Sequence, residues 1–140
     1  MKKRRDQKHL SSVYLRSEPG RRYNLWEVGA REEWQSVLVT SDGAVGGRVV
    51  RKVIEPASYM VRYLVVYRPD LKCHLLLPAN TVVGADGGEV HCRLSKGALD
   101  KLPPYRFEPI TRSLEEQLYA SLGVTPHWVE ENAFNPFELE

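Results

Sequence analysis

A chain of 140 residues is long enough for one globular domain with tails, and its 42% hydrophobic content argues against wholesale disorder. Two cysteines cannot build a disulfide framework, and no apolar run approaches the roughly 18–20 residues of a membrane-spanning helix. The net charge of +2 is unevenly placed: residues 1–22 hold eight Lys or Arg against two acidic residues, whereas residues 108–140 hold one Arg against seven Glu.

The first 24 residues are polar and basic, and we expect them to form a flexible arm. The arm contains five clustered cations, Lys2, Lys3, Arg4, Arg5 and Lys8. These side chains are candidates for binding a nucleic acid or an anionic membrane surface. No apolar segment follows them to make a signal peptide, and the two cysteines fit a reducing compartment, so we expect a cytoplasmic protein.

Residues 36–95 contain β-branched and apolar runs separated by turn residues, the pattern of a small all-β barrel or sandwich. We expect strands over residues 37–39, 45–55, 59–67, 72–77, 82–83 and 89–94. Asp42-Gly43 and Gly87-Gly88 favour hairpin turns with positive φ. Gly46-Gly47 predicts a bulge or bend inside the second strand, as closure of a small barrel requires. The fold prediction is therefore a small closed six-stranded barrel over residues 25–107.

The run from Tyr59 to Tyr67 is apolar on both of its faces, which predicts a central strand that is covered on both sides. Tyr59, Tyr63 and Tyr67 share one face with two valines. Three tyrosines on one face could instead form a platform on which nucleic-acid bases stack. Packing in the core is the favoured interpretation because no basic residue interleaves with the tyrosines on that face.

The C-terminal part, residues 108–140, is predicted to hold one helix and an acidic tail that pack on the barrel. Ser113 and Glu116 have the spacing of a capping box, and Gly123 suits the left-handed position after a helix. Leu114, Leu118 and Leu122 form one apolar stripe. Because so short a helix is marginal in water by itself, it must dock on another surface. Upstream, Ser95 is predicted to cap a single helical turn that ends at Leu99.

The order of several short motifs resembles the PRC-barrel domain. The motifs are Asp42-Gly43 with Gly46, Val61 to Val66, Leu75 to Pro78, a Gly-rich turn with Val90 to Ser95, Leu102 to Tyr105, and Pro126-His127-Trp128. The resemblance covers roughly residues 36–128. PRC-barrel domains occur in the cytoplasmic part of the H subunit of purple-bacterial photosynthetic reaction centres, in ribosome-maturation factors and in small stand-alone proteins. The resemblance implies a six-stranded barrel that works by binding and not by catalysis.

The sequence contains no convincing catalytic or metal-binding motif. Cys73-His74 and His91-Cys92 lack the spacing of zinc knuckles. Neighbouring residues on a strand point to opposite faces, so if Cys73 lies opposite Cys92, each face offers only two ligands. No nucleophile elbow, phosphate-binding glycine loop or HExxH sequence is present. We therefore expect a protein that is not an enzyme and has no metal or cofactor.

Four residues near the C-terminus, Tyr105, Tyr119, His127 and Trp128, are candidates for a functional surface. Their aromatic side chains either pack the tail on the barrel or form a groove for a protein partner. The leading hypothesis is a non-catalytic protein-binding or scaffold module, with a homo-oligomer as one form. One alternative is an RNA- or ribosome-associated maturation factor that uses the basic arm. The other is a membrane-proximal accessory of a photosynthetic or electron-transport complex.

Overall fold

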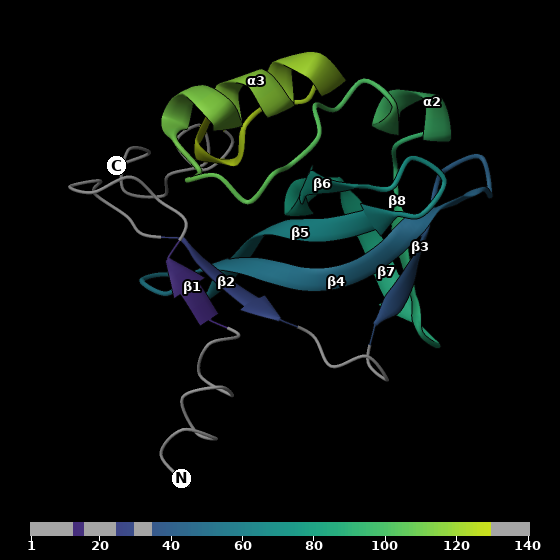
Figure 1. Cartoon of the computed structure of the whole chain (residues 1–140), viewed down its shortest axis with the longest axis horizontal. Helices are drawn as coiled ribbons and strands as arrows, with labels where there is room; N and C mark the ends of the chain where they lie inside the picture. The colour runs from purple at the N-terminus through teal and green to yellow at the C-terminus, as the bar shows by residue number, and fades with distance from the viewer. Residues whose placement is uncertain (1–12, 16–24, 30–34, 130–140) are drawn as a thin grey trace, which may run out of the picture.

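The computed structural model describes residues 13–15, 25–29 and 35–129 (Figure 1). The strands are β1 (Val13–Leu15), β2 (Trp26–Gly29), β3 (Ser36–Val39), β4 (Val45–Glu55), β5 (Met60–Arg68), β6 (Cys73–Pro78), β7 (Val82–Asp86) and β8 (Glu89–Cys92). The helices are the 3-10 turn η2 (Ala79–Thr81), α2 (Lys96–Leu99) and α3 (Arg112–Leu122). The strands expected from residue 37 onward are all present, with small differences at their ends.

The strands form one open sheet of eight strands, in the order β1-β2-β4-β3-β8-β7, with β5 on the other side of β4 and β6 beyond β5. The predicted closed six-stranded barrel is therefore wrong. Within the described residues, β6 pairs only with β5, and β7 pairs only with β8. Beyond β6 the later chain forms an isolated bridge, in which the amide of Tyr105 donates to the carbonyl of His74 at 2.8 Å.

The route of the chain explains why the sheet stays open. The strand β8 joins β3 in parallel, with Val37 opposite Glu89, while β7 folds back on β8 as the outer strand. The last two strands therefore extend the sheet beyond β3, at the end opposite to β6. Closure would need one of these two strands to pair with β6, and within the described residues neither of them does.

The predicted bulge in β4 is confirmed at Gly46-Gly47, where the pairing with β3 shifts register. Gly47 has φ of +140°, and a Cβ atom there would lie 2.5 Å from the carbonyl oxygen of Tyr67. A Cβ on Gly46 would lie 2.7 Å from a methyl group of Leu99 in α2. Two glycines thus let β5 and α2 approach β4 closely.

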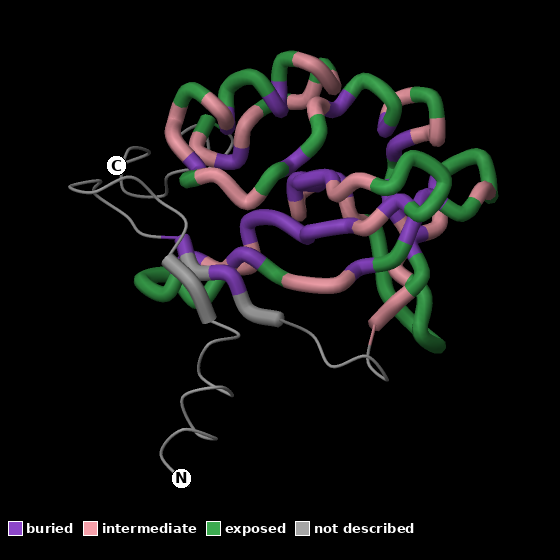
Figure 2. Tube along the Cα trace, viewed as in Figure 1, coloured by how far each residue is buried: buried purple, intermediate pink, exposed green. Residues whose placement is uncertain are grey.

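The central strand of the core is β5, as predicted, since it lies between β4 and β6 and is largely buried. Tyr63 is completely buried, and the ring of Tyr67 lies 5.0 Å from the ring of His74. The tyrosines therefore do not form an exposed stacking platform. Figure 2 shows the buried residues concentrated along β5 and on the sides of the helices that face the sheet.

Helices α2 and α3 lie on the same side of the sheet (Figure 1). The predicted cap of α2 is confirmed, because the Ser95 side chain accepts a hydrogen bond from the Ala98 amide at 3.1 Å. For α3 the predicted capping box is wrong. The helix begins after Thr111, whose hydroxyl accepts from the Leu114 amide at 3.1 Å. Gly123 ends α3 with φ of 65°, in the predicted left-handed conformation.

Two predicted segments lie outside the described residues. The arm cations Lys2, Lys3, Arg4, Arg5 and Lys8 belong to one, and the acidic end of the chain after residue 129 to the other. Within the part of the chain that the structure describes, no helix has the length and apolar content needed to cross a membrane.

Candidate functional site

Three of the four aromatic candidates come together beside α3. Tyr119 projects from α3, and the chain after Gly123 turns back so that the Trp128 ring lies 5.5 Å from the Tyr119 ring and 5.1 Å from the His127 ring. Tyr105 is elsewhere, 4.9 Å from the ring of Phe107, with its hydroxyl donating to Glu27 at 3.2 Å. The structure therefore groups Tyr119, His127 and Trp128, and leaves Tyr105 in a separate cluster.

The burial of these aromatic residues indicates whether they pack the tail or form a surface for a partner. Tyr105, Tyr119 and His127 are 4%, 1% and 7% exposed, so none of them presents a surface to a partner. Trp128 is partly exposed, and the Arg112 guanidinium lies 3.7 Å from the centre of its ring, a close cation–π contact. Their arrangement packs the segment after α3 against the helix and the sheet.

A cluster of buried polar groups lies next to these rings. Glu115 on α3 is fully buried and accepts a hydrogen bond from the Tyr63 hydroxyl of β5 at 2.5 Å. Nε2 of His127 lies 3.9 Å from the same carboxylate. Burial, together with the negative charge of Glu115, raises the pKa of Tyr63 far above its ordinary value, so Tyr63 stays a neutral donor. Burial also raises the pKa of Tyr119, to about 12.

A buried ion pair lies beside the turn of the β4–β5 hairpin. Arg62 donates to one carboxylate oxygen of Glu55 from Nε at 2.9 Å and from a terminal nitrogen at 2.6 Å. Ser58 donates to the same oxygen at 2.7 Å. Burial acts to raise the pKa of Glu55, but the hydrogen bonds from Ser58 and Arg62 outweigh it and lower the pKa. The two buried charges are therefore paired and hold the hairpin rigid.

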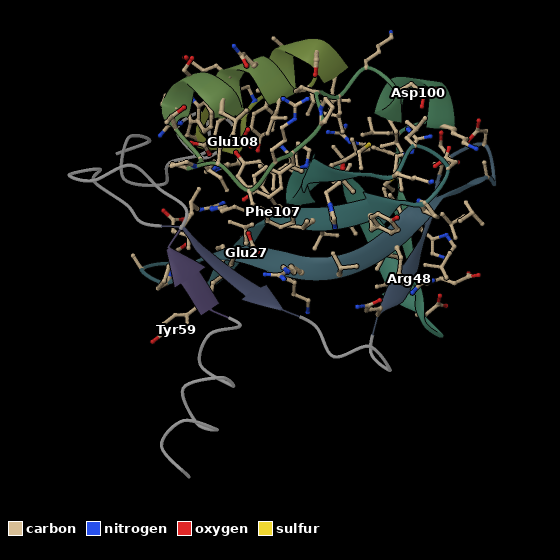
Figure 3. All side chains as sticks on the ribbon, viewed as in Figure 1. Glu27, Arg48, Tyr59, Asp100, Phe107 and Glu108 are labelled. Carbon is tan, nitrogen blue, oxygen red and sulfur yellow. The ribbon has the colours of Figure 1, made fainter. Side chains whose placement is uncertain are left out.

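The sequence interpretation missed Glu115 and Tyr59. Glu115 lies three residues before Leu118 and four before Tyr119, so it belongs to the buried stripe of the helix, and this spacing could have identified it. Tyr59, at the end of the β4–β5 hairpin, is 93% exposed and has φ of 55° (Figure 3). The turn before it, Pro56-Ala57-Ser58, contains no glycine or asparagine that could take the left-handed conformation.

A cavity of about 140 Å³ adjoins this end of the hairpin. It is lined by Met60, Val61, Arg62, Ala79, Asn80 and His127. Met60 is 48% exposed at its rim. The cavity thus connects the exposed end of the hairpin with the buried cluster around His127 and Arg62.

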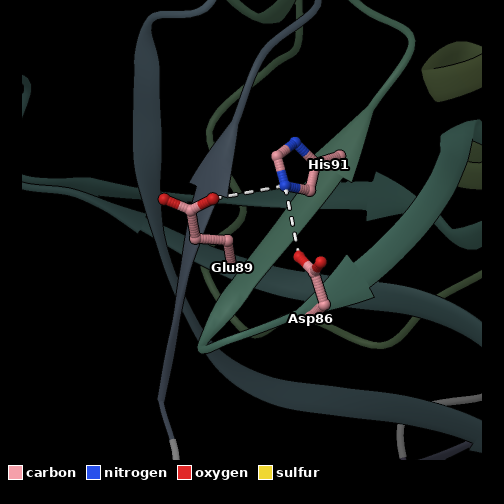
Figure 4. A group of neighbouring side chains, drawn as sticks. All are labelled: Asp86, Glu89 and His91. Atoms are coloured by element: carbon pink, nitrogen blue, oxygen red, sulfur yellow. Dashed lines mark ion pairs between the residues drawn. The ribbon is translucent and has the colours of Figure 1, made fainter.

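The two Cys-His pairs do not face each other. Cys73 lies opposite Arg68 on β5, and Cys92 lies opposite Val82 on β7, so the two cysteines do not lie opposite each other. Both cysteines are free thiols. His91 instead belongs to a group with Asp86 and Glu89, whose ligand atoms all lie within 4.8 Å of one another (Figure 4).

Comparison with known proteins gives no family for this chain. No protein-family model matches it. No curated protein matches it either. The resemblance to the PRC-barrel domain stays a prediction, while the closed barrel that it implies is replaced by the open sheet. The candidate site is therefore defined by geometry: a rigid hairpin with an exposed aromatic end, a small adjoining cavity and a buried cluster of charges beneath them.

Proposed function

We propose that the chain is a non-catalytic protein-binding module whose contact area is the free end of the β4–β5 hairpin. We call this area the hairpin-end surface and define it as Tyr59, Met60 and the adjoining cavity. The observation that carries the proposal is the backbone of Tyr59. An almost fully exposed tyrosine occupies a conformation that glycine or asparagine adopts with less strain.

The exposed ring of Tyr59 does not offset its backbone strain by burial. The left-handed conformation costs an L-amino acid roughly 1–2 kcal/mol, and an exposed ring gains little from burial in return. Strained residues of this kind concentrate at sites of function. Tyrosine is also among the residues that most often dominate the energy of a protein–protein contact. Tyr59 is therefore suited to be the anchor residue of an interface.

The adjoining cavity supplies the second element of a contact site. A dry cavity of roughly 150 Å³ accommodates a group of benzene size, and the cavity beside Met60 measures about 140 Å³. Met60, Val61 and Ala79 give it an apolar wall, while Arg62, Asn80 and His127 are polar. We expect the partner to insert one apolar side chain here and to cover the Tyr59 ring with another.

The buried charges beneath the surface favour tight binding because they hold it in shape. The Glu55–Arg62 pair joins the two strands of the hairpin, and Glu115 joins β5 to α3 through Tyr63. Less ordering is then needed when a partner binds. The free thiols of Cys73 and Cys92 are in keeping with a reducing compartment such as the cytoplasm.

The test compares two glycine substitutions in quantitative affinity purification of the full chain from native lysate. Tyr59→Gly removes the ring and relieves the backbone. Lys72→Gly relieves the same kind of strain, φ of 51°, at the exposed β5–β6 turn and is the matched control. We expect a specific protein to be recovered with the native chain and with Lys72→Gly and lost with Tyr59→Gly, and its purified form to reproduce the difference. Equal recovery with Tyr59→Gly would reject the hairpin-end surface.

Self-association is measured in parallel by sedimentation of the purified chain. An oligomer that Tyr59→Gly dissociates and Lys72→Gly preserves would identify a second copy of the chain as the partner. The RNA-associated and membrane-proximal alternatives stay predictions, since the cations on which they depend lie outside the described residues.

A further inference from the structure

We infer that Asp86, Glu89 and His91 form a binding site for a divalent first-row transition-metal ion, of which Zn²⁺ is the representative. The site is on the β7–β8 hairpin, on a part of the sheet that the proposed protein contact does not use. It offers one imidazole nitrogen and two carboxylate groups (Figure 4). These are ordinary ligands for such an ion.

The backbone brings the three side chains to one place. Asp86 lies directly opposite Glu89 in the antiparallel pairing of β7 with β8. His91 is two residues beyond Glu89 on the same strand, so the two side chains share a face of the sheet. Gly87 and Gly88, with φ of 54° and 80°, allow the tight turn that sets this register. The convergence follows from strand pairing and turn geometry, and does not depend on a chance meeting of long side chains.

The distances fit a single ion. Nε2 of His91 lies 3.3 Å from a Glu89 oxygen and 3.7 Å from an Asp86 oxygen. Bonds of 2.0–2.2 Å from zinc to nitrogen and oxygen place neighbouring ligand atoms about 3.2–3.6 Å apart in a tetrahedron. The oxygens of Asp86 and Glu89 lie no more than 4.8 Å apart, so a modest side-chain movement brings all three donors around one ion.

The charge of the group provides an independent argument for a cation. Within the described residues, the ion pairs of Asp86 and Glu89 are with His91 alone, and no Lys or Arg joins them. A protonated imidazole would balance only one of the two carboxylates, whereas a divalent ion balances both. The buried Glu55 differs, since it has an arginine in direct contact. The hairpin thus holds two negative carboxylates close together, and the positive charge of one histidine cannot balance both of them.

The donor set also selects the kind of ion. Ca²⁺ and Mg²⁺ prefer sites made of oxygen alone, whereas an imidazole nitrogen favours Zn²⁺ and its neighbours in the first transition row. The three residues are 40% to 87% exposed, so further coordination positions remain open to water. A site with three protein ligands and open positions binds reversibly.

The test is a titration of the full chain with Zn²⁺. Binding is measured by calorimetry and by the NMR signals of the histidine ring nitrogens. We expect one equivalent to bind and to shift the Nε2 signal of His91. His91→Gln and Asp86→Asn should each weaken binding at least about tenfold. His74→Gln is the matched control, because His74 is a half-buried strand residue between Tyr67 and Phe107, and it should leave the affinity unchanged.

Each variant is expected to stay folded because the three replaced side chains are at least partly exposed. Unfolding curves recorded without metal check this. Two results would overturn the inference: no saturable shift of His91 up to millimolar Zn²⁺, or undiminished binding by His91→Gln. Displacement of Zn²⁺ by an equal concentration of Ca²⁺ would also contradict it, because the choice of ion depends on the nitrogen donor.

Discussion

The molecule contains two groups of histidine and carboxylate that differ in almost every respect except composition. In the first, Glu115 and His127 lie buried between α3 and the sheet, beside the hydroxyl of Tyr63. In the second, Asp86, Glu89 and His91 stand on the surface of the β7–β8 hairpin. The buried group has its charge satisfied by protein, so it holds the fold together. Within the described residues, the carboxylates of the exposed group form ion pairs only with its own histidine, so we expect the fold to depend little on this group.

The largest expected effect is from Glu115→Ala, which tests whether the buried group is structural. Loss of the carboxylate removes the acceptor of the buried Tyr63 hydroxyl and the negative charge beside Arg112 and His127. Breaking a buried charged pair typically costs about 3–5 kcal/mol in the free energy of unfolding, measured by urea denaturation. The adjacent Glu116 is exposed, and Glu116→Ala should change stability by less than about 0.5 kcal/mol. Equal effects of the two substitutions would contradict the assignment.

A smaller effect is expected in the turns that carry the two hairpins. Gly88 has φ of 80°, so Gly88→Ala should lower the free energy of unfolding by about 1–2 kcal/mol.

Tyr59→Gly should have the opposite sign and raise the free energy of unfolding by up to about 1 kcal/mol, because a residue with a strained backbone is exchanged for glycine, which tolerates positive φ. Thermal or urea unfolding measures both. A destabilised Tyr59→Gly would show that the ring contributes to folding.

The pH dependence of stability tests the contribution of Glu55, the paired carboxylate beside the β4–β5 turn. The pKa of Glu55 is lowered in the folded protein, so its contribution is complete above the unfolded-state pKa near 4.5 and is lost as the pH falls through the folded value. Urea unfolding at pH 7, 5, 4 and 3 should show a smaller acid loss in Glu55→Gln than in the native chain. Asp42 and Asp70, whose pKa values are also lowered, act equally in both proteins. Identical acid profiles would exclude Glu55 as a contributor.

The smallest effect is expected from removing the exposed group. The double substitution Asp86→Asn with Glu89→Gln should alter the free energy of unfolding by less than about 0.5 kcal/mol without metal, because exposed ion pairs contribute little. The measurement is urea unfolding in the presence of a chelator. A loss of several kcal/mol would mean that this hairpin is held by its charges, and the contrast between the two groups would disappear.

Local structure could be predicted from the sequence where the signal is local. The strands β4 and β5, the Ser95 cap and the Gly46-Gly47 bulge depend on neighbouring residues, and the structure has them where expected. The start of α3 was wrong by two residues because Thr111 and Ser113 are equally good caps, and packing of the helix decides between them.

The closure of the sheet could not be predicted because it depends on which distant edges meet. The sequence pattern of β8 does not distinguish pairing with β3 from pairing with β6. The candidate site was found only in part. The grouping of Tyr119, His127 and Trp128 was suggested by their place near the C-terminus, but their burial was not. The exposure of Tyr59 was missed because the turn was expected to consist of Pro56, Ala57 and Ser58. In the structure the left-handed residue of this turn is Tyr59 itself.

The parallel contact of β3 with β8 has a consequence for the order in which the chain becomes structured. Val37 cannot find its partner at Glu89 until the hairpins between them are synthesised. Contacts between such distant residues form slowly because a long loop must first be closed. On the ribosome, the edge of β3 that will pair with β8 therefore stays unpaired while β4 pairs with the other edge of β3 and β5 and β6 are added next to β4. Any partner or chaperone that recognises nascent strands would meet this edge first.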